Sequence, residues 1–331
     1  MTSGQHIDGV LVQWGERLFY PGNRIVRSAP LPRLDGMLRR KAAVIRKRIE
    51  ATVRRAPQVM IKVTGGGRGM AAIAAHFRYI SKNGKLEIED DREVVRTGKE
   101  AVRDLAEQWR YGGSLIPEEG HRREAFNIML SMPAGTNATL LQKAAREFAQ
   151  TELAGHRYVM VLHEHQANPH VHLSVRAEAA SGKRLNPRKA DLQRWRETFA
   201  EKLRGWGIEA EATRQASRGE SRNFEPLWRI KAKEEGRLRT ASVAMKTGRA
   251  GTLSRADAMV SWAHIMKALA ASEVAEDRQL AERVAAFVRG TTFVREQFGQ
   301  GSKVPLRQHR PSNELSPPGV GRSRPSPDIS R

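Results

Sequence analysis

The run YVMVLHEHQANPHVHLSVR, residues 158–176, holds two apolar segments joined by a polar turn, and it carries four of the ten histidines of the chain. The segments 158–163 and 169–176 each predict a β-strand, because β-branched and other apolar residues recur in them. Pro169 places the start of the second strand, since proline is tolerated at the first position of a strand and not in its middle. The sequence therefore predicts an antiparallel hairpin whose histidines gather where the two strands meet.

The segments around the hairpin predict further strands and helices. Strands are expected at 59–63 and 126–131, and helices at 70–81, within 94–111, at 138–153 and at 188–206. Because the hairpin makes at least part of the sheet antiparallel, we predict an α+β domain. Its central sheet would be antiparallel or mixed and flanked by helices, and the domain would span about residues 58–220.

Three segments lie outside this domain. Residues 1–57 form a basic N-terminal extension, in which 10–14 predicts a short strand and 37–55 a basic amphipathic helix. Residues 221–300 predict a helical region. Residues 301–331 contain six prolines and six serines together with several arginines, a composition typical of a disordered basic tail.

Composition narrows the class of partner and of chemistry. The 331 residues include 58 Lys and Arg against 36 Asp and Glu, and this net charge of +22 favours a polyanion, nucleic acid before anionic membrane. No run approaches the roughly 18 consecutive apolar residues of a membrane-spanning helix, and no secretory signal is seen, so we expect a cytoplasmic protein without membrane insertion. Because the chain has no cysteine, disulfides, thiolate metal ligands and a cysteine nucleophile are excluded.

The histidines of the hairpin predict a metal site. Side chains at i and i+2 of a strand share a face, so His170 and His172 point to one side, where His163 reaches them from the paired strand. His165 is an ambiguous fourth ligand. Three imidazoles with open positions left over suit a catalytic divalent metal, and on ligand type they favour Zn, Mn, Ni or Co over Mg. The alternative is an ordinary set of surface or core histidines.

Tyr79 has the residue type and the position that best fit a nucleophile. The chain lacks both cysteine and a Gly-x-Ser-x-Gly sequence, and Tyr79 is one of only four tyrosines. It lies on the predicted helix 70–81, and the cations close to it in sequence are Arg78, Lys82 and Lys85. Cations favour an ionised phenol and attract phosphate, so this stretch predicts a tyrosine that attacks a phosphodiester. The alternative is a half-buried helix residue among solvated charges.

Three stretches of the chain resemble, in order and spacing, motifs of the conjugative relaxases. These are the mobilisation nucleases of the histidine–hydrophobe–histidine superfamily, and the likeness is greatest to the P class, which includes the T-DNA border endonucleases. The stretches are TGGG at 64–67 with FRYISKNGKLE at 77–87, NIMLSMPAGT at 127–136, and HEHQANPHVH at 163–172. The resemblance covers about residues 58–220, and three ordered motifs are far more specific than any one.

The resemblance implies particular roles for residues of the site. Tyr79 maps onto the nucleophile, and Ser131 maps onto a serine that helps to hold the DNA beside the cleaved bond. The metal ligands map onto His163, His170 and His172, and the metal of the family is generally Mg or Mn.

The resemblance also implies an activity and partners. The activity is that of a DNA relaxase, which nicks one strand at the origin of transfer of a plasmid or integrative element, forms a 5′-phosphotyrosyl intermediate, and rejoins the strand after conjugative transfer. The partners are single-stranded and supercoiled DNA at that origin, accessory relaxosome proteins and a type IV coupling protein. The resemblance implies that the protein is located in the cytoplasm of a bacterial donor cell. Whether it is also transferred to the recipient with the DNA is left open.

The chain departs from the family pattern beside its first metal-site histidine. The family often has an acid at the position of His165 and a further histidine at that of Asn168. The group that orients a ligand imidazole is therefore open between His165, Glu164 and an acid distant in sequence.

Basic residues near the motifs predict the contacts with DNA phosphates. They are Arg78, Lys82, Lys85, Lys183 and Arg184. The last two follow the second histidine strand directly and are the best placed of the five by sequence.

Two other functions fit part of the sequence. A related replication initiator or single-strand transposase would share the superfamily chemistry, although the motifs around Tyr79 and Ser131 favour the P class. A non-enzymatic DNA-binding protein would use its histidines for structural zinc, and it would form no covalent adduct with DNA.

Overall fold

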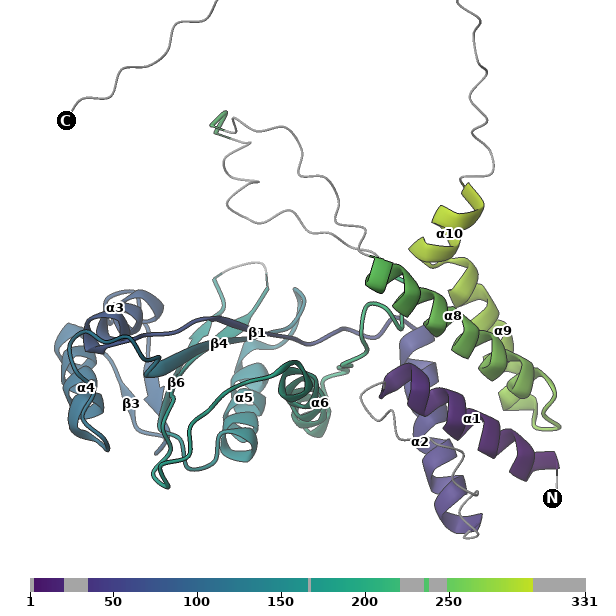
Figure 1. Ribbon diagram of the computed structural model, residues 1–331, viewed down its shortest axis with the longest axis horizontal. Coiled ribbons are helices and arrows are strands. Elements are labelled where there is room, and N and C mark those ends of the chain that lie inside the picture. The colour runs from purple at the N-terminus through teal and green to yellow at the C-terminus, as the bar shows by residue number, and fades with distance from the viewer. Residues whose placement is uncertain (1–2, 21–34, 166–167, 221–234, 238–248, 300–331) are drawn as a thin grey trace, which may run out of the picture.

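The chain forms a sheet with helices on both faces and, beside it, a bundle of helices drawn from both ends of the sequence (Figure 1). The predicted tail at 301–331 lies outside the residues that can be described. Among the described helices, none is long and apolar enough to cross a membrane. The parts of the chain that the computed structural model describes are residues 3–20, 35–165, 168–220, 235–237 and 249–299.

Six strands form one antiparallel sheet, which confirms the predicted α+β class. The order across the sheet is β1-β4-β6-β5-β2-β3. Each neighbouring pair runs antiparallel, and the predicted histidine hairpin is the pair β5 and β6, with His163 opposite His170. The strands are β1 (Met60–Gly65), β2 (Ile88–Asp90), β3 (Val95–Arg96), β4 (Ala125–Ser131), β5 (Tyr158–His163) and β6 (His170–Arg176).

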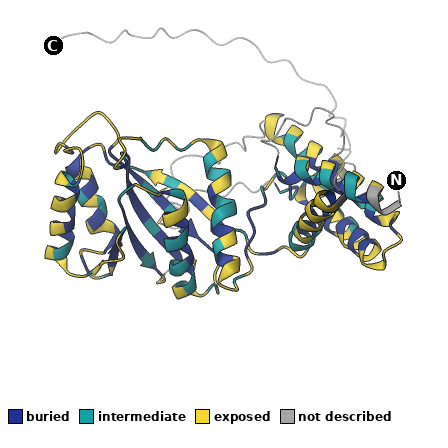
Figure 2. Ribbon diagram, turned by 90° about the horizontal axis from the view of Figure 1, so that it is seen from below, coloured by how far each residue is buried: buried dark blue, intermediate teal, exposed yellow. Residues whose placement is uncertain are grey.

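Helices cover both faces of the sheet, with their apolar sides toward the strands (Figure 2). On one face, α3 (Met70–Ile80) and α4 (Lys99–Tyr111) pack on β5 through a core that includes Phe77 and Trp109. On the other, α5 (Ala138–Glu152) and α6 (Lys189–Gly205) pack through Phe148 and Trp195. The four helices agree with the predicted ones to within a few residues, except that β3 occupies the first part of the segment 94–111.

A left-handed turn ends α3 beside the predicted nucleophile. Lys82, Asn83 and Gly84 follow the helix with φ of 49°, 58° and 80°. A Cβ at Gly84 would lie 2.4 Å from the carbonyl carbon of Gly98, so this position requires glycine. The Gly84 N–H also donates to Ser81 Oγ at 3.1 Å. The turn fixes where α3 stops and therefore where the residues of its last turn lie.

The strands β2 and β3 were not predicted from the sequence. They have three and two residues, and β2 lacks the run of apolar residues that is typical of a buried strand. Two of its three residues are acids, and both are buried. Glu89 accepts from Arg146 Nε at 2.5 Å, and Asp90 accepts from Arg96 Nη1 at 2.7 Å. Pairing with arginines from other elements offsets the desolvation of these carboxylates.

The second group of elements is a terminal helix bundle, formed by helices of the N-terminal and C-terminal segments. The predicted helix at 37–55 is confirmed as α2, whereas the short strand predicted at 10–14 is wrong, because this segment lies inside α1. Ile7, Leu11 and Leu18 recur at helical spacing and are buried in the core of the bundle. The bundle consists of α1 (Ser3–Phe19), α2 (Asp35–Val53), α8 (Arg249–Ala270), α9 (Ala275–Arg289) and the short α10 (Thr292–Gly299).

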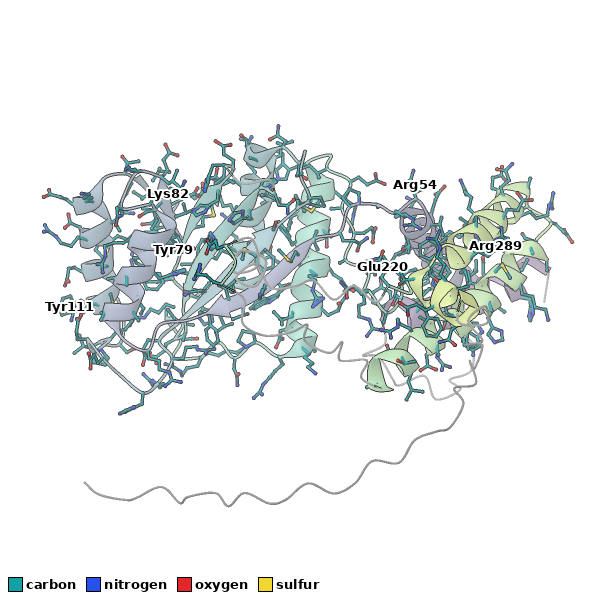
Figure 3. The ribbon with its side chains drawn as sticks, turned by 90° about the horizontal axis from the view of Figure 1, so that it is seen from above. Arg54, Tyr79, Lys82, Tyr111, Glu220 and Arg289 are labelled. Atoms are coloured by element: carbon teal, nitrogen blue, oxygen red, sulfur yellow. The ribbon has the colours of Figure 1, made fainter. Side chains whose placement is uncertain are left out.

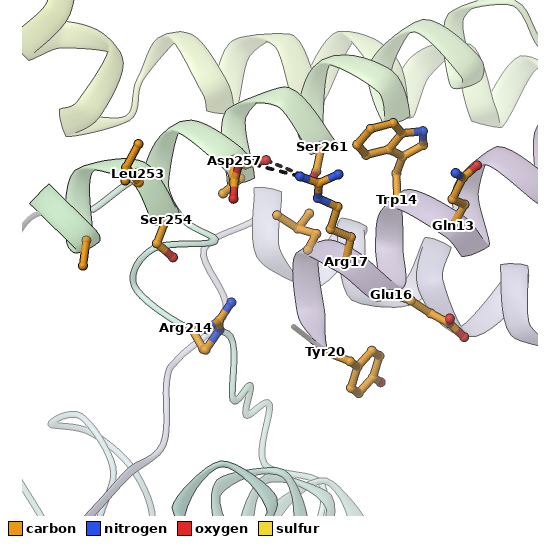
Figure 4. A pocket seen from close by; sticks show the side chains of 13 residues that line it. Gln13, Trp14, Glu16, Arg17, Tyr20, Arg214, Leu253, Ser254, Asp257 and Ser261 are labelled. Atoms are coloured by element: carbon orange, nitrogen blue, oxygen red, sulfur yellow. Dashed lines mark hydrogen bonds and ion pairs between the residues drawn. The ribbon is translucent and has the colours of Figure 1, made fainter. Parts of the chain in front are cut away.

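A pocket of about 700 Å³ opens on the bundle, between α1, α8 and Arg214 (Figure 4). The ion pair between Arg17 and Asp257, with 3.6 Å between nitrogen and oxygen, crosses it. The bundle is also bonded to the segment that follows the sheet domain, since Trp262 Nε1 donates to the carbonyl of Ser217 at 2.7 Å. The domain boundaries predicted at 57/58 and 220/221 stay a prediction.

An arginine ties three helices of the bundle together. Arg46 of α2 donates from Nη1 to Asp8 of α1 at 2.7 Å, and from Nε and Nη2 to Asp277 of α9 at 2.8 and 2.9 Å. The side chain of Asp277 is only 6% exposed, so its charge depends on these partners. Burial raises the pKa of Asp277, but the hydrogen bonds from Arg46 and Ser272 outweigh burial and lower it.

Replacing Arg46 by methionine should destabilise the bundle. The change leaves the buried carboxylate of Asp277 without its guanidinium, and we expect the free energy of unfolding at pH 7, measured with urea, to fall by about 1–3 kcal/mol. Arg103→Met, on the exposed face of α4, is the matched control and should change it by less than about 0.5 kcal/mol. Equal losses in both variants would contradict the role of Arg46.

The same pair predicts a pH dependence of stability. A carboxylate whose pKa is lowered by folding stabilises the native state above its unfolded pKa, and this contribution is lost as the pH falls through the folded value. The stability difference between the wild type and Arg46→Met should therefore be full at neutral pH and should shrink below about pH 4. Urea titrations at pH 7 and pH 3.5 measure it, and a difference that grows in acid would contradict the ion pair.

Candidate active site

The three histidines that the sequence predicted as ligands come together at one end of the hairpin. The ring centroid of His163 lies 5.1 Å from that of His170 and 4.7 Å from that of His172, and the latter two are 5.0 Å apart. One nitrogen from each ring lies within 4.8 Å of the other two. This three-histidine cluster follows from the strand register, which sets His163 opposite His170, and from the period of two that puts His172 on the same face.

Backbone carbonyls orient two of the rings. His163 Nε2 lies 2.6 Å from the carbonyl oxygen of Ile80, and His170 Nδ1 lies 2.9 Å from that of Asn168. Because a carbonyl only accepts, these nitrogens donate, and the opposite nitrogen of each ring keeps its lone pair. Main-chain carbonyls, and not a side chain, therefore orient the imidazoles of His163 and His170. In the described part of the chain no acid is hydrogen-bonded to these two rings.

Burial favours the neutral form of two rings of the cluster. It lowers the pKa of His172 to about 3, with the neighbouring imidazoles of His163 and His170 acting in the same direction. It also lowers the pKa of His163, against the opposing effect of the hydrogen bond to Ile80. A neutral imidazole offers the lone pair that a metal ion requires.

The donor set fits a divalent metal. Each of the three rings offers one nitrogen, and these atoms lie close enough together to share one ion. Three imidazole nitrogens and no carboxylate suit Mn, Zn, Ni or Co on ligand type, and Mg less well. The fourth predicted imidazole, His165, is exposed with its ring 5.2 Å from that of His163, and it is not among the converging groups.

Tyr79 lies next to this cluster on the last turn of α3. It directly precedes Ile80, whose carbonyl holds the ring of His163. Its side chain is 71% exposed, beside the strands and on the same side of the molecule as Lys82 (Figure 3). The ring of His76, one turn earlier on α3, lies 6.2 Å away from the Tyr79 ring between centroids. The phenol is therefore open to solvent while its backbone is fixed to the histidine cluster.

Ser131 lies at the same end of the sheet but is buried. It is 4% exposed and stands opposite His170 across the pair of strands β4 and β6. Its hydroxyl donates to the carbonyl of Pro169 at 3.2 Å. Ser131 therefore fixes the start of the histidine strand in this structure, and its predicted contact with DNA stays a prediction.

The basic residues predicted to contact DNA separate into two groups. Arg78, Lys82 and Lys85 are exposed around the end of α3, and Lys82 lies close enough to His163 to lower the pKa of that ring. Lys183 and Arg184 follow the opposite end of β6, which is ~20 Å from His170 at the usual rise of a strand. Arg184 is also paired with Glu178 at 3.0 Å. The first group is next to the histidines and the second is not.

A protein-family model for relaxases matches this part of the chain. The model describes the MobA/VirD2-like nuclease domain and matches residues 79–208, which begin at Tyr79 and include the three clustered histidines. The chain carries a relaxase nuclease domain.

Curated relatives agree with this assignment. The chain is 27% identical over 184 residues to the T-DNA border endonuclease VirD2 of Rhizobium radiobacter, over 49% of this chain and 43% of that protein. The T-DNA border endonucleases VirD2 of Agrobacterium fabrum and Rhizobium rhizogenes match at the same identity, over 41% and 42% of their lengths. The chain thus spans about two fifths of the length of the curated relatives it matches.

Sequence reasoning missed two groups of the relaxase nuclease domain. One is the carbonyl of Ile80, which no side-chain pattern could reveal because the contact uses the main chain. The other is His76, which stands three residues before Tyr79 and therefore on the same side of α3. Its spacing from Tyr79 was the available signal.

Removal of one clustered imidazole should remove the metal. We expect the wild type to bind one Mn²⁺ per chain in calorimetric titration, and His170→Ala to weaken binding by more than the roughly 10–100-fold typical of losing an outer contact. His165→Ala is the matched control from the same turn and should bind nearly as the wild type does. Equal losses in both variants would contradict the three-histidine cluster as the metal site.

Proposed function

We propose that this protein is a DNA relaxase, in which Tyr79 attacks a phosphodiester of one DNA strand and the three-histidine cluster holds the divalent metal. The observation that carries the proposal is the contact of 2.6 Å between His163 Nε2 and the carbonyl of Ile80, because it anchors the residue after Tyr79 to the cluster. The relaxase family match over 79–208 supports it.

The chemistry follows from a phenol next to a cation site. The Tyr79 phenol loses its proton as its oxygen forms a bond to phosphorus, the bond to the 3′ oxygen of the preceding nucleotide breaks, and that oxygen gains a proton to become the free 3′ hydroxyl. The product is a 5′-phosphotyrosyl bond, which keeps the energy of the broken linkage and so allows the strand to be rejoined. When bound, a divalent ion would supply polarisation of the phosphate.

The three imidazoles of His163, His170 and His172 would hold this ion. Mg or Mn is the metal that the resemblance implies, and of the two the nitrogen donor set favours Mn. Zn, Ni and Co fit the same donors.

Cations around the end of α3 would receive the phosphates that flank the cleaved bond. Arg78 precedes Tyr79 directly, and Lys82 lies near His163. Lys183 and Arg184, at the other end of β6, would contact the strand only further along. Ser131 would act on the DNA by holding the start of the histidine strand, and its hydroxyl would have to leave Pro169 to touch a nucleotide.

The resemblance to relaxases also suggests a substrate, partners and a place of action for this protein. The substrate would be a single strand within supercoiled DNA at an origin of transfer, with accessory relaxosome proteins and a type IV coupling protein as partners. The protein would act in the cytoplasm of a bacterial donor. Residues 58–220 would form the nuclease domain, and the basic segment 301–331 would be the part that a secretion apparatus reads.

Replacing Tyr79 by phenylalanine should abolish cleavage and leave DNA binding intact. The test incubates the protein with Mn²⁺ and single-stranded oligonucleotides of randomised sequence, and it detects DNA that stays on the protein in denaturant and is released by protease. Mass spectrometry of the adduct should place it on Tyr79. Tyr111→Phe is the matched control, since Tyr111 is 70% exposed at the end of α4 and lies apart from Tyr79 (Figure 3). Adduct formation by Tyr79→Phe would sink the assignment.

Arg78→Gln should weaken binding of single-stranded DNA through one lost phosphate contact. Each such contact contributes about −0.7 to the slope of log affinity against log salt, so the slope should become shallower by about that amount. Lys183→Gln is the comparison at the far end of β6 and should change the slope less for a short oligonucleotide. A larger change of the slope in Lys183→Gln than in Arg78→Gln would contradict the proposal that the DNA strand lies along the end of α3.

A further inference from the structure

One of the three clustered histidines lacks the contact that fixes the other two. His163 and His170 each donate to a backbone carbonyl, at 2.6 and 2.9 Å. Nδ1 of His172 is buried, and no hydrogen-bond partner for it exists within the described ranges. Ligand imidazoles are usually held through their second nitrogen, so the ring of His172 should have such a partner as well.

His76, on α3, carries a second buried nitrogen of the same kind. Its Nε2 is buried and has no partner in the part of the chain that the structure describes. Its ring meets that of His172 edge-on, with 6.4 Å between centroids and 76° between planes. The ring also lies at an angle of 28° to that of Tyr79, with 6.2 Å between centroids. His76 is therefore in contact with both the proposed nucleophile and the ring of His172.

A water molecule shared by these two nitrogens would give each of them a hydrogen-bond partner. No hydrogen bond joins the rings of His76 and His172 directly in the part of the chain that the structure describes, and their centroids lie 6.4 Å apart. Polar groups that do not touch can be joined through one ordered water. A buried water needs at least two polar partners, and both rings supply one. A neutral imidazole has one N–H and one lone pair, so each ring can donate to or accept from the same water.

We propose that His76 is a positioning residue of the metal centre, which holds the ring of His172 through one bridging water and links it to the turn of α3 that carries Tyr79. It fills the place for which the sequence offered His165, Glu164 or a distant acid. The inference rests on the proposed metal site, and it is independent of whether Tyr79 forms an adduct with DNA.

The affinity for Mn²⁺ tests this role in the full-length chain. His76→Leu keeps the bulk of the side chain and removes its polar atoms, so we expect Mn²⁺ to bind about 10–100-fold more weakly. His76→Gln keeps a polar group that can reach a water, and it should recover most of the loss. His121→Gln, an exposed histidine elsewhere in the domain, is the matched control and should bind as the wild type does.

A second measurement reads the hydrogen bond without metal. Nitrogen NMR of the imidazoles in the metal-free protein should show His172 in one fixed tautomer in the wild type and in His76→Gln, and in a mixture in His76→Leu. Unchanged Mn²⁺ affinity and tautomer in His76→Leu would overturn the proposal. If His76→Leu does not fold, His76→Gln decides. Nearly wild-type Mn²⁺ affinity with one fixed tautomer of His172 would support the proposal, and a loss of about 10-fold or more, or a mixed tautomer, would overturn it.

The outcomes separate this proposal from the proposed function. A wild type that binds no Mn²⁺ would overturn the positioning role together with the metal site. A wild type that binds Mn²⁺ in a manner sensitive to His76, yet forms no DNA adduct, would leave the positioning role standing and would reject the nuclease assignment of Tyr79.

Discussion

The hydrogen bond between His163 and the carbonyl of Ile80 is the constraint on which the arrangement of the site depends. It joins residues 83 positions apart in sequence, at the end of β5 and the end of α3. Carbonyls of the last helical turn have no partner within the helix, so α3 can offer one without losing a bond of its own. The ring is held in one tautomer, and the helix end is held at one height above the sheet. The side chain of Tyr79, between Arg78 and Ile80, inherits its position from that bond.

The chemistry of the site is shaped by what surrounds the three imidazoles. His163 and His170 are buried and His172 is half-buried, and burial favours the neutral form of His163 and His172. No carboxylate joins the converging groups in the described part of the chain. An ion held by such ligands keeps its full positive charge for an outside anion. The exposed cations near the end of α3 act in the same direction, so the local field suits a phosphate much better than a neutral substrate.

The sequence was sufficient for the sheet domain wherever a local pattern carried the information. The histidine hairpin is an example, because the period of a strand and one proline determine which rings share a face. The strand β2 could not be found in this way, since its acids are buried only because Arg146 and Arg96 arrive from other elements. The strand prediction for residues 10–14 was wrong for a related reason. Its apolar run is too short to separate strand from helix, and the partners that decide the matter are helices at the other end of the chain.

The candidate site shows the same division. The clustering of the three histidines was accessible, because residue type and spacing in the hairpin indicate it directly. The role of Tyr79 as the nucleophile stays a prediction. The contacts that hold His163 and His170 were not accessible, because they use the main-chain carbonyls of Ile80 and Asn168. Lys183 and Arg184 stand close to the histidines in sequence, yet the length of a strand separates them in space.

The terminal helix bundle has a consequence for how the protein is made. Arg46 and its partner Asp277 are 231 residues apart, so the first two helices leave the ribosome long before the helices that cover their apolar sides. At a synthesis rate of about 5–20 residues per second this interval is roughly 10–50 s. During that time the sheet domain can complete itself, whereas the apolar sides of α1 and α2 are without the helices that cover them in the folded protein. The order of synthesis therefore favours a sheet domain that folds first and a bundle that closes last.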